Sequence, residues 1–270
     1  MSQSDIPEYG APPVPPPGHY EEVQEPARLG PVQRFSGVMF SPGETFKDIN
    51  RKPTWLIPLL ISMVIAAGFT FFFEWRVKPD WDQLVRTETK KVLDRFGQPM
   101  PPEDEMQRAV ARQKVIAQIR PIIGPLLFTF FLAGVFVLGM LVMAAQTTFK
   151  KILSVITWSA AVTSLVQSLV IAGSLMLRDE ESLKIINVAD PTTYSATSLA
   201  AVLPSDASGS LKLVASGVDI FSLWFLILLV IGFVAISGSK RITNGKAGFL
   251  VFGLWAIWLV ILAGIGSMFA

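Results

Sequence analysis

Three polar side chains lie within or at the edge of long apolar stretches, and they are the residues of this sequence best placed to do chemistry. They are Gln146, Gln167 and Asp219. Polar groups inside a membrane segment are costly, so they usually face a partner or a transport path. An amide such as Gln167 predicts a hydrogen bond between helices in preference to substrate binding. Together, the three side chains could line a polar path, as in a small transporter or channel.

Asp219 has two interpretations, which depend on where its helix begins. A helix that starts at this residue makes Asp219 an ordinary amino-terminal acid, which interacts favourably with the helix dipole. A helix that starts near Leu213 buries the carboxylate and makes Asp219 a candidate site residue. The first interpretation is favoured, and the second stays open.

Four small residues recur at every fourth position of one apolar stretch, at Ala160, Ser164, Ser168 and Ala172. Residues four apart share one face of a helix, and small side chains there let a second helix approach closely. That second helix belongs either to the same bundle or to another copy of the chain. Packing within one bundle is favoured because the other apolar helices need contacts, and a homo-oligomer is the alternative.

No constellation of catalytic, cofactor-binding or metal-binding residues is visible. The chain has no Cys and a single His, His19, so thiolate zinc sites, paired-histidine metal motifs and Ser–His pairs are excluded. A membrane aspartyl dyad needs two buried acids, and only Asp219 qualifies. A phosphate loop fails because six residues separate Gly238 from Gly245 and Ala247 replaces the Ser or Thr that binds magnesium. We therefore expect no cofactor and no enzymatic activity.

The composition indicates a membrane protein. Of the 270 residues, 51% are hydrophobic and 16% are charged, whereas a soluble domain has about 25% charged residues. The net charge of +2 and the lack of a basic stripe argue against nucleic-acid binding. Five apolar runs, without the alternation of barrel strands, predict an all-α polytopic membrane protein with a five-helix transmembrane bundle in the lipid bilayer. The expected spans are residues 55–75, 121–145, 152–177, 218–237 and 247–269.

The amino-terminal part divides into a tail and the start of the membrane domain. Residues 1–31 are rich in Pro and acidic residues and predict a disordered cytoplasmic tail. The membrane domain covers residues 32–270. In residues 32–52 apolar side chains alternate with Arg34, Lys47, Arg51 and Lys52, and a short helix is predicted from Pro42 to about Asn50. Such a helix is expected to lie at the membrane interface.

The first long connection, residues 76–120, predicts a polar loop with helical order. Asp80 is typical of a helix N-cap, and apolar residues follow it at helical spacing. Gly97 ends this helix. A second helix starts at the acidic residues from Glu103 onward and leads toward the second span.

The short connections between spans indicate how the chain is oriented. By parity, the amino terminus and the connections after the second and fourth spans lie on one side. Basic residues concentrate there, so the positive-inside rule predicts a cytoplasmic amino terminus and an outside carboxyl terminus. The loop 76–120 opposes this assignment, because it carries ten Lys or Arg residues. The expected cytoplasmic anchors are Lys47, Arg51, Lys52, Lys150, Lys151, Lys240, Arg241 and Lys246.

Several stretches resemble the Yip family of Ypt/Rab-interacting membrane proteins, specifically its bacterial branch. They are residues 40–46 with Pro53 and Pro58 after them, residues 148–155, and residues 219–224. The resemblance implies a five-span fold with a cytoplasmic amino terminus in the bacterial cytoplasmic membrane. Eukaryotic members look like adaptors that contact small GTPases in vesicle traffic. We therefore expect a non-enzymatic scaffold or adaptor that engages a cytoplasmic protein partner or anionic lipid.

Overall fold

The protein is described by a computed structural model over residues 27–184, 186, 193–204, 207–238 and 242–268. The predicted Pro-rich tail therefore falls almost entirely outside the described residues. Within them, the structure is all-helical and forms no sheet. Its helices are α1 Pro31–Phe40, α2 Pro42–Arg51, α3 Leu56–Val77, α4 Trp81–Phe96, α5 Glu103–Val142, α6 Phe149–Met176, α7 Glu180–Lys184, η2 Leu199–Val202 (a 3-10 helix), α8 Gly209–Ser216, α9 Ile220–Ile236 and α10 Asn244–Met268.

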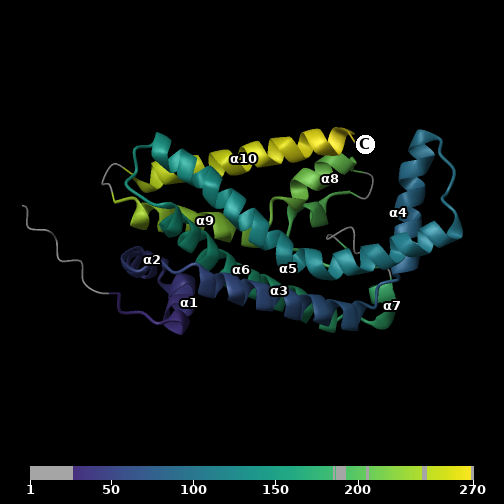
Figure 1. Ribbon diagram of the computed structural model, residues 1–270, viewed down its shortest axis with the longest axis horizontal. Coiled ribbons are helices and arrows are strands. Elements are labelled where there is room, and N and C mark those ends of the chain that lie inside the picture. The colour runs from purple at the N-terminus through teal and green to yellow at the C-terminus, as the bar shows by residue number, and fades with distance from the viewer. Residues whose placement is uncertain (1–26, 185, 187–192, 205–206, 239–241, 269–270) are drawn as a thin grey trace, which may run out of the picture.

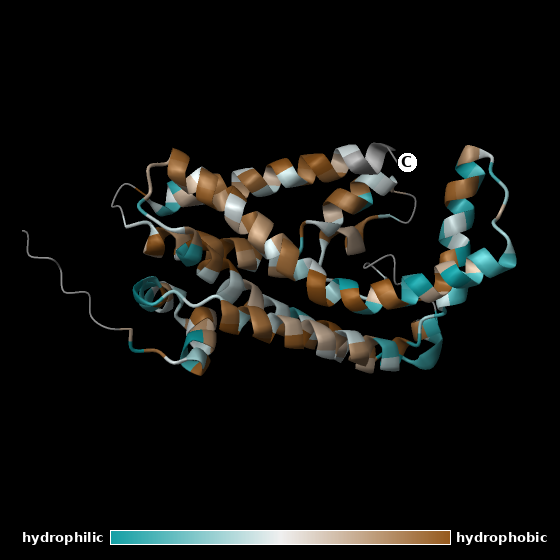
Figure 2. Ribbon diagram, in the orientation of Figure 1, coloured by the Kyte–Doolittle hydropathy of each residue, from teal (hydrophilic) through white to brown (hydrophobic). Residues whose placement is uncertain are grey.

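Five apolar helices, α3, α5, α6, α9 and α10, run along the long axis of the molecule (Figure 1). Four of them are long and apolar enough to cross a membrane, and α9 is equally apolar but shorter. Hydrophobic residues cover their middle sections, whereas hydrophilic residues gather toward the two ends of the molecule (Figure 2). This distribution is that of a helical membrane protein, because apolar side chains on the outer surface are stable only in a lipid environment.

α5 corrects the predicted division between the polar loop and the second span. It is one continuous helix of 40 residues with Pro121 and Pro125 inside it. At about 1.5 Å per residue it is about 60 Å long, twice the thickness of the hydrocarbon core. Residues 103–120, which the sequence assigned to a separate helix before the second span, are therefore continuous with that span in one helix. The helix also ends at Val142, before the predicted end of the span at residue 145.

α4 folds back on the first part of α5 to form a helical hairpin. Asp80 caps α4 by accepting a hydrogen bond from the Gln83 N–H at 3.0 Å, as the sequence predicts. Gly97 ends α4 with a φ of 63°, a left-handed conformation that favours glycine. The Arg86 guanidinium then joins the two helices by donating to both oxygens of Glu103 at 2.6 and 3.0 Å.

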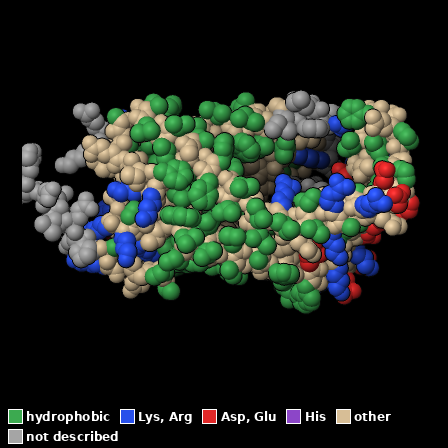
Figure 3. All heavy atoms as spheres, viewed as in Figure 1, with side chains coloured by type: hydrophobic (Ala, Val, Ile, Leu, Met, Phe, Trp, Pro, Cys, Tyr) green, Lys and Arg blue, Asp and Glu red, His purple; other side chains and the backbone are tan. Residues whose placement is uncertain are grey.

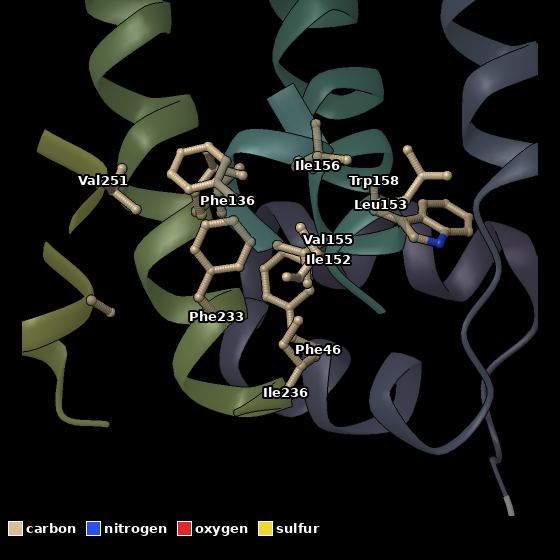
Figure 4. Close-up of a cluster of buried hydrophobic side chains, with 14 of the residues drawn as sticks. Phe46, Phe136, Ile152, Leu153, Val155, Ile156, Trp158, Phe233, Ile236 and Val251 are labelled. Carbon is tan, nitrogen blue, oxygen red and sulfur yellow. The ribbon is translucent and has the colours of Figure 1, made fainter. Parts of the chain in front are cut away.

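The largest core cluster lies at the end of the molecule where α6 begins (Figure 4). Phe136 of α5 and Phe233 of α9 pack with ring centroids 4.8 Å apart. α6 and α9 approach closely because Gly232 has no side chain, and a methyl group there would overlap Val155. Phe46 and Ile49 of α2 complete the cluster and are fully buried.

This packing also determines which helices cover the apolar face of α2. The sequence predicts that a helix over residues 42–50 lies at the membrane interface. In the structure, α2 occupies that segment, and its apolar face is covered by α6 and α9. The reason is that Phe46 and Ile49 gain more contacts in a protein cavity than on a lipid surface.

Candidate functional sites: a basic platform and a polar recess

One end of the molecule is a basic platform, which we define as α1, α2 and the first turns of α6 and α10. In Figure 3 this end shows Lys and Arg side chains, whereas the opposite end mixes basic and acidic ones. The backbone N–H of Gln146 donates to the Ser237 carbonyl at 2.8 Å, which joins the two connections that lie there. The exposed or half-exposed basic residues of the platform are Lys47, Arg51, Lys52, Lys150, Lys151 and Lys246. The predicted anchors Lys240 and Arg241 lie outside the described residues.

A buried ion pair holds α1 and α2 together in this platform. Arg34 of α1 donates to Oδ2 of Asp48 from Nε at 3.0 Å and from Nη2 at 2.7 Å. The two residues are only 3% and 4% exposed. The other carboxylate oxygen of Asp48 accepts the backbone N–H of Arg28 at 2.7 Å. Because a buried charge is stable only when paired and hydrogen-bonded, this geometry fixes both helices and the chain that precedes them.

The same guanidinium extends the network to the body of the molecule. Nη1 of Arg34 donates to the Lys52 carbonyl at 3.0 Å and to Oγ1 of Thr54 at 2.7 Å. The indole N–H of Trp158, in the buried part of α6, donates to the same Thr54 hydroxyl at 3.3 Å. The platform is therefore connected to the spanning helices by hydrogen bonds as well as by apolar packing.

The electrostatics of Asp48 follow from these contacts. Burial by itself raises the pKa of its carboxyl group, but the Arg28 N–H and the Arg34 guanidinium outweigh burial. The pKa of Asp48 consequently lies below its ordinary value, and the side chain is ionised at neutral pH.

Sequence reasoning missed this pair, because it counted Arg34 only among the basic residues that alternate with apolar ones in residues 32–52, and it gave Asp48 no role. The sequence does contain a pattern that could have predicted the pair, because Arg34 and Asp48 each lie on the apolar face of a helix. Arg34 precedes the buried Val38 by four residues, and Asp48 lies between the buried Phe46 and Ile49. Charges at buried positions predict an internal partner.

The ladder of small residues on α6 lies on its half-buried side. Ala160 and Ser164 line a recess between α6, α3 and α5. Further along, Ser168 and Ala172 are also half-buried, and α3 packs there through its contacts with neighbouring α6 residues. Helices α3 and α5 are thus the neighbours of the ladder in a single chain, and the choice between packing within one bundle and a homo-oligomer stays a prediction.

The three predicted intramembrane polar residues do not come together. Gln146 is exposed in the connection between α5, which ends at Val142, and α6. Its backbone contacts Ser237 at the end of α9, whereas Asp219 caps the start of α9. The 17 residues of α9 separate these two positions by about 25 Å. A single polar path through all three side chains is not formed.

Asp219 combines the two interpretations that the sequence separated. It is the N-cap of α9, because its Oδ1 accepts the N–H groups of Phe221 and Ser222 at 2.8 and 3.2 Å. It is also 7% exposed, because the connection before α9 covers it and Thr197 donates its hydroxyl to Oδ2. Both carboxylate oxygens are therefore occupied, which indicates a structural role.

Gln167 lies in a different environment, a polar recess between α5, α6 and α9. The recess has a volume of about 240 Å³ and also contains Thr129 and Ser222. Nothing in the described part of the chain accepts or donates a hydrogen bond to the Gln167 side chain. The bond between helices that the sequence predicts is therefore not made. Across the described residues, His, Asp and Glu side chains also form no group of three that could hold a metal ion.

Comparisons with known proteins place this fold among membrane proteins. A family model described as the Yip1 domain matches residues 36–265. The membrane protein YknW of Bacillus subtilis (strain 168) is 25% identical over 233 residues, which cover 86% of this chain and 90% of YknW. No solved structure matches the chain.

Proposed function

Because this chain belongs to the Yip1 domain family of membrane proteins, we propose that it is a non-enzymatic scaffold or adaptor of a bacterial cytoplasmic membrane. In this proposal the basic platform binds a cytoplasmic protein with an acidic surface or the anionic headgroups of the inner leaflet. The rigid attachment of the platform to the spanning helices is the observation that supports the proposal most directly.

The proposed membrane arrangement has five spans and a cytoplasmic amino terminus. α9 is about 25 Å long, slightly less than the hydrocarbon core, and a short span is tolerated through local thinning of the bilayer. The basic platform then faces the cytoplasm, as the positive-inside rule favours for its short basic connections, although the ten Lys or Arg residues of 76–120 count against this orientation. The hairpin of α4 and α5 lies on the other side, and α2 lies at the cytoplasmic interface.

Two properties of the platform suit recruitment rather than catalysis. Its basic residues are exposed around helices whose positions are fixed by the Arg34–Asp48 pair and by Phe46. Each basic residue near an anionic membrane surface contributes about 1 kcal/mol of attraction. A rigid, multivalent basic surface therefore gives a partner one defined orientation relative to the bilayer.

The competing hypothesis was a small transporter with a polar path near Gln167 and Asp219. Asp219 uses its carboxylate to cap α9 and to bind Thr197. Gln146, the third member of that path, lies at the opposite end of α9. This arrangement gives the transport hypothesis less support than the scaffold hypothesis.

The test is purification from native membranes in mild detergent, with quantitative mass spectrometry of bound proteins and lipids. The platform variant carries Lys52→Gln, Lys150→Gln and Lys151→Gln. We expect a stoichiometric protein partner or an enrichment of anionic lipid with the unmodified chain, and its loss from the platform variant.

A matched control removes the same amount of charge at the opposite end of the molecule. It carries Lys90→Gln, Lys91→Gln and Lys114→Gln, three exposed positions on α4 and α5. This control should retain the partner. The proposal is contradicted if the particles contain only this chain and the lipid composition is the same in all three preparations. Catalytic turnover by the purified protein also contradicts it.

A further inference from the structure

The polar recess contains three side chains that lack partners. Thr129 of α5, Gln167 of α6 and Ser222 of α9 all line it. Within the described residues, no hydrogen bond is made by the hydroxyl groups of Thr129 and Ser222 or by the Gln167 amide. Thr129 is only 7% exposed. Three helices thus contribute polar side chains without a hydrogen-bond partner to the lining of one recess, and polar groups next to the hydrocarbon region gain from a partner that can hydrogen-bond with them.

An apolar groove adjoins the recess. It runs between α5, α9 and α10 and has a volume of about 420 Å³. Its lining is almost wholly apolar and includes Val135, Leu254 and Trp258. Phe128, Leu132, Ser222 and Phe225 belong to both the recess and the groove. The two spaces therefore meet along a shared wall of α5 and α9.

We propose that the recess and groove form a binding site for one membrane lipid with an uncharged, hydrogen-bonding ester region. The ester oxygens of the lipid occupy the recess, where they accept hydrogen bonds from the Gln167 amide and from the hydroxyl groups of Thr129 and Ser222. A lipid hydroxyl in the same place can also donate a hydrogen bond to these side chains. One acyl chain occupies the groove. The lining of the recess includes no charged residue, so the recognised group is the glycerol ester part of the lipid and not its charged headgroup.

The position of the site fits a lipid of the leaflet opposite the basic platform. Ser222 is the third residue of α9, at the end of that helix distant from the platform. The groove continues from Ser222 to Leu229, a distance of about 10 Å along the helix axis. In the proposed membrane arrangement the polar recess thus lies nearer the membrane surface, and the apolar groove extends toward the bilayer centre. The ester region and the acyl chain of a lipid are arranged in the same order.

The lining of the groove suits a lipid acyl chain. Water is unsuitable in a groove that offers so few polar partners. An empty groove loses the dispersion contacts of its walls. An acyl chain, which the bilayer supplies at high concentration, needs no polar partner and restores the dispersion contacts of the walls.

The first experiment uses the full chain in vesicles of phosphatidylethanolamine and phosphatidylglycerol that carry a photoreactive group on the acyl chain. Peptide mapping should locate the label on the α5, α9 and α10 segments that line the groove. Val135→Trp fills the groove and should reduce this labelling to the level of an exposed helix face. Val64→Trp is the matched control, because Val64 lies on α3 and is 72% exposed.

The second experiment addresses the recess, and it remains informative if Val135→Trp impairs folding. Gln167→Leu should lower the amount of lipid retained after delipidation by about fivefold, the loss of roughly one hydrogen bond. It should leave the thermal midpoint of the protein unchanged, because Gln167 binds no other residue among those described. Any of three results overturns the proposal. They are equal labelling of the groove and of the exposed α3 face, cross-links between two copies through groove residues, and unchanged lipid retention in Gln167→Leu.

Discussion

Asp48→Asn is the substitution that tests the organisation of the basic platform most directly. Asparagine keeps the shape of the side chain, and its Oδ1 can still accept the Arg28 N–H that now lies 2.7 Å from Asp48. It removes the negative charge that faces Nε and Nη2 of Arg34. The guanidinium then remains in a site where it is 3% exposed, without a counter-charge.

The expected cost follows from that burial. Removing one partner of a buried ion pair destabilises the folded state by about 3–5 kcal/mol. Arg34 keeps its hydrogen bonds to the Lys52 carbonyl and to Thr54, so we expect the lower value. About 3 kcal/mol corresponds to a change somewhat above a hundredfold in an equilibrium constant.

Hydrogen exchange with mass spectrometry in lipid nanodiscs measures this change locally. The amides of α1 and α2 should lose somewhat more than a hundredfold of their protection, while those of α6 change less, because the platform can open without unfolding the spans. Glu44→Gln is the control, since the Glu44–Lys47 pair is exposed and such pairs contribute little.

A double substitution sharpens the test. Arg34→Met with Asp48→Leu removes both charges and should restore much of the protection, because apolar pairs of similar volume often replace buried ion pairs without loss. Equal protection in Asp48→Asn and Glu44→Gln would refute the argument that the buried pair positions the platform.

Three further predictions concern pH, helix packing and the length of α5. The pKa of Asp48 is lower in the folded protein than in the unfolded chain. The stabilisation that its ionised carboxylate gives is therefore complete above about pH 4 and declines as the pH falls through the folded pKa. Hydrogen exchange of α1 and α2 should show this decline in the unmodified protein and not in the protein with Arg34→Met and Asp48→Leu. Gly232→Ala should lower the thermal midpoint in detergent, because the added methyl overlaps a side chain of α6, whereas Gly253→Ala has open space and should not. Spin labels at Lys114 and Leu141, introduced as cysteines into a chain that has none, should lie about 40 Å apart if α5 is continuous, and a much shorter distance refutes a single helix.

Local patterns allowed much of the helical structure to be predicted. Long apolar runs without the alternation of barrel strands can satisfy their backbone in lipid only as helices, and the described apolar helices lie within or overlap those runs. Asp80 and Gly97 were identified correctly as the ends of α4, because a cap and a left-handed glycine act within a few residues of the chain. The continuity of α5 was not predicted, because two prolines near a change in polarity resemble a helix boundary.

The candidate sites depended on contacts between distant segments. The sequence determined that this chain is a helical membrane protein with the Yip1 domain, and that its basic residues cluster in a few short segments. Only the tertiary structure decided that Arg34 pairs with Asp48 and that Gln167 faces a recess with Thr129 and Ser222. Helical periodicity specifies which face of a helix a side chain occupies. The neighbour that this face meets is set by how several helices pack together, and a single sequence does not show that packing.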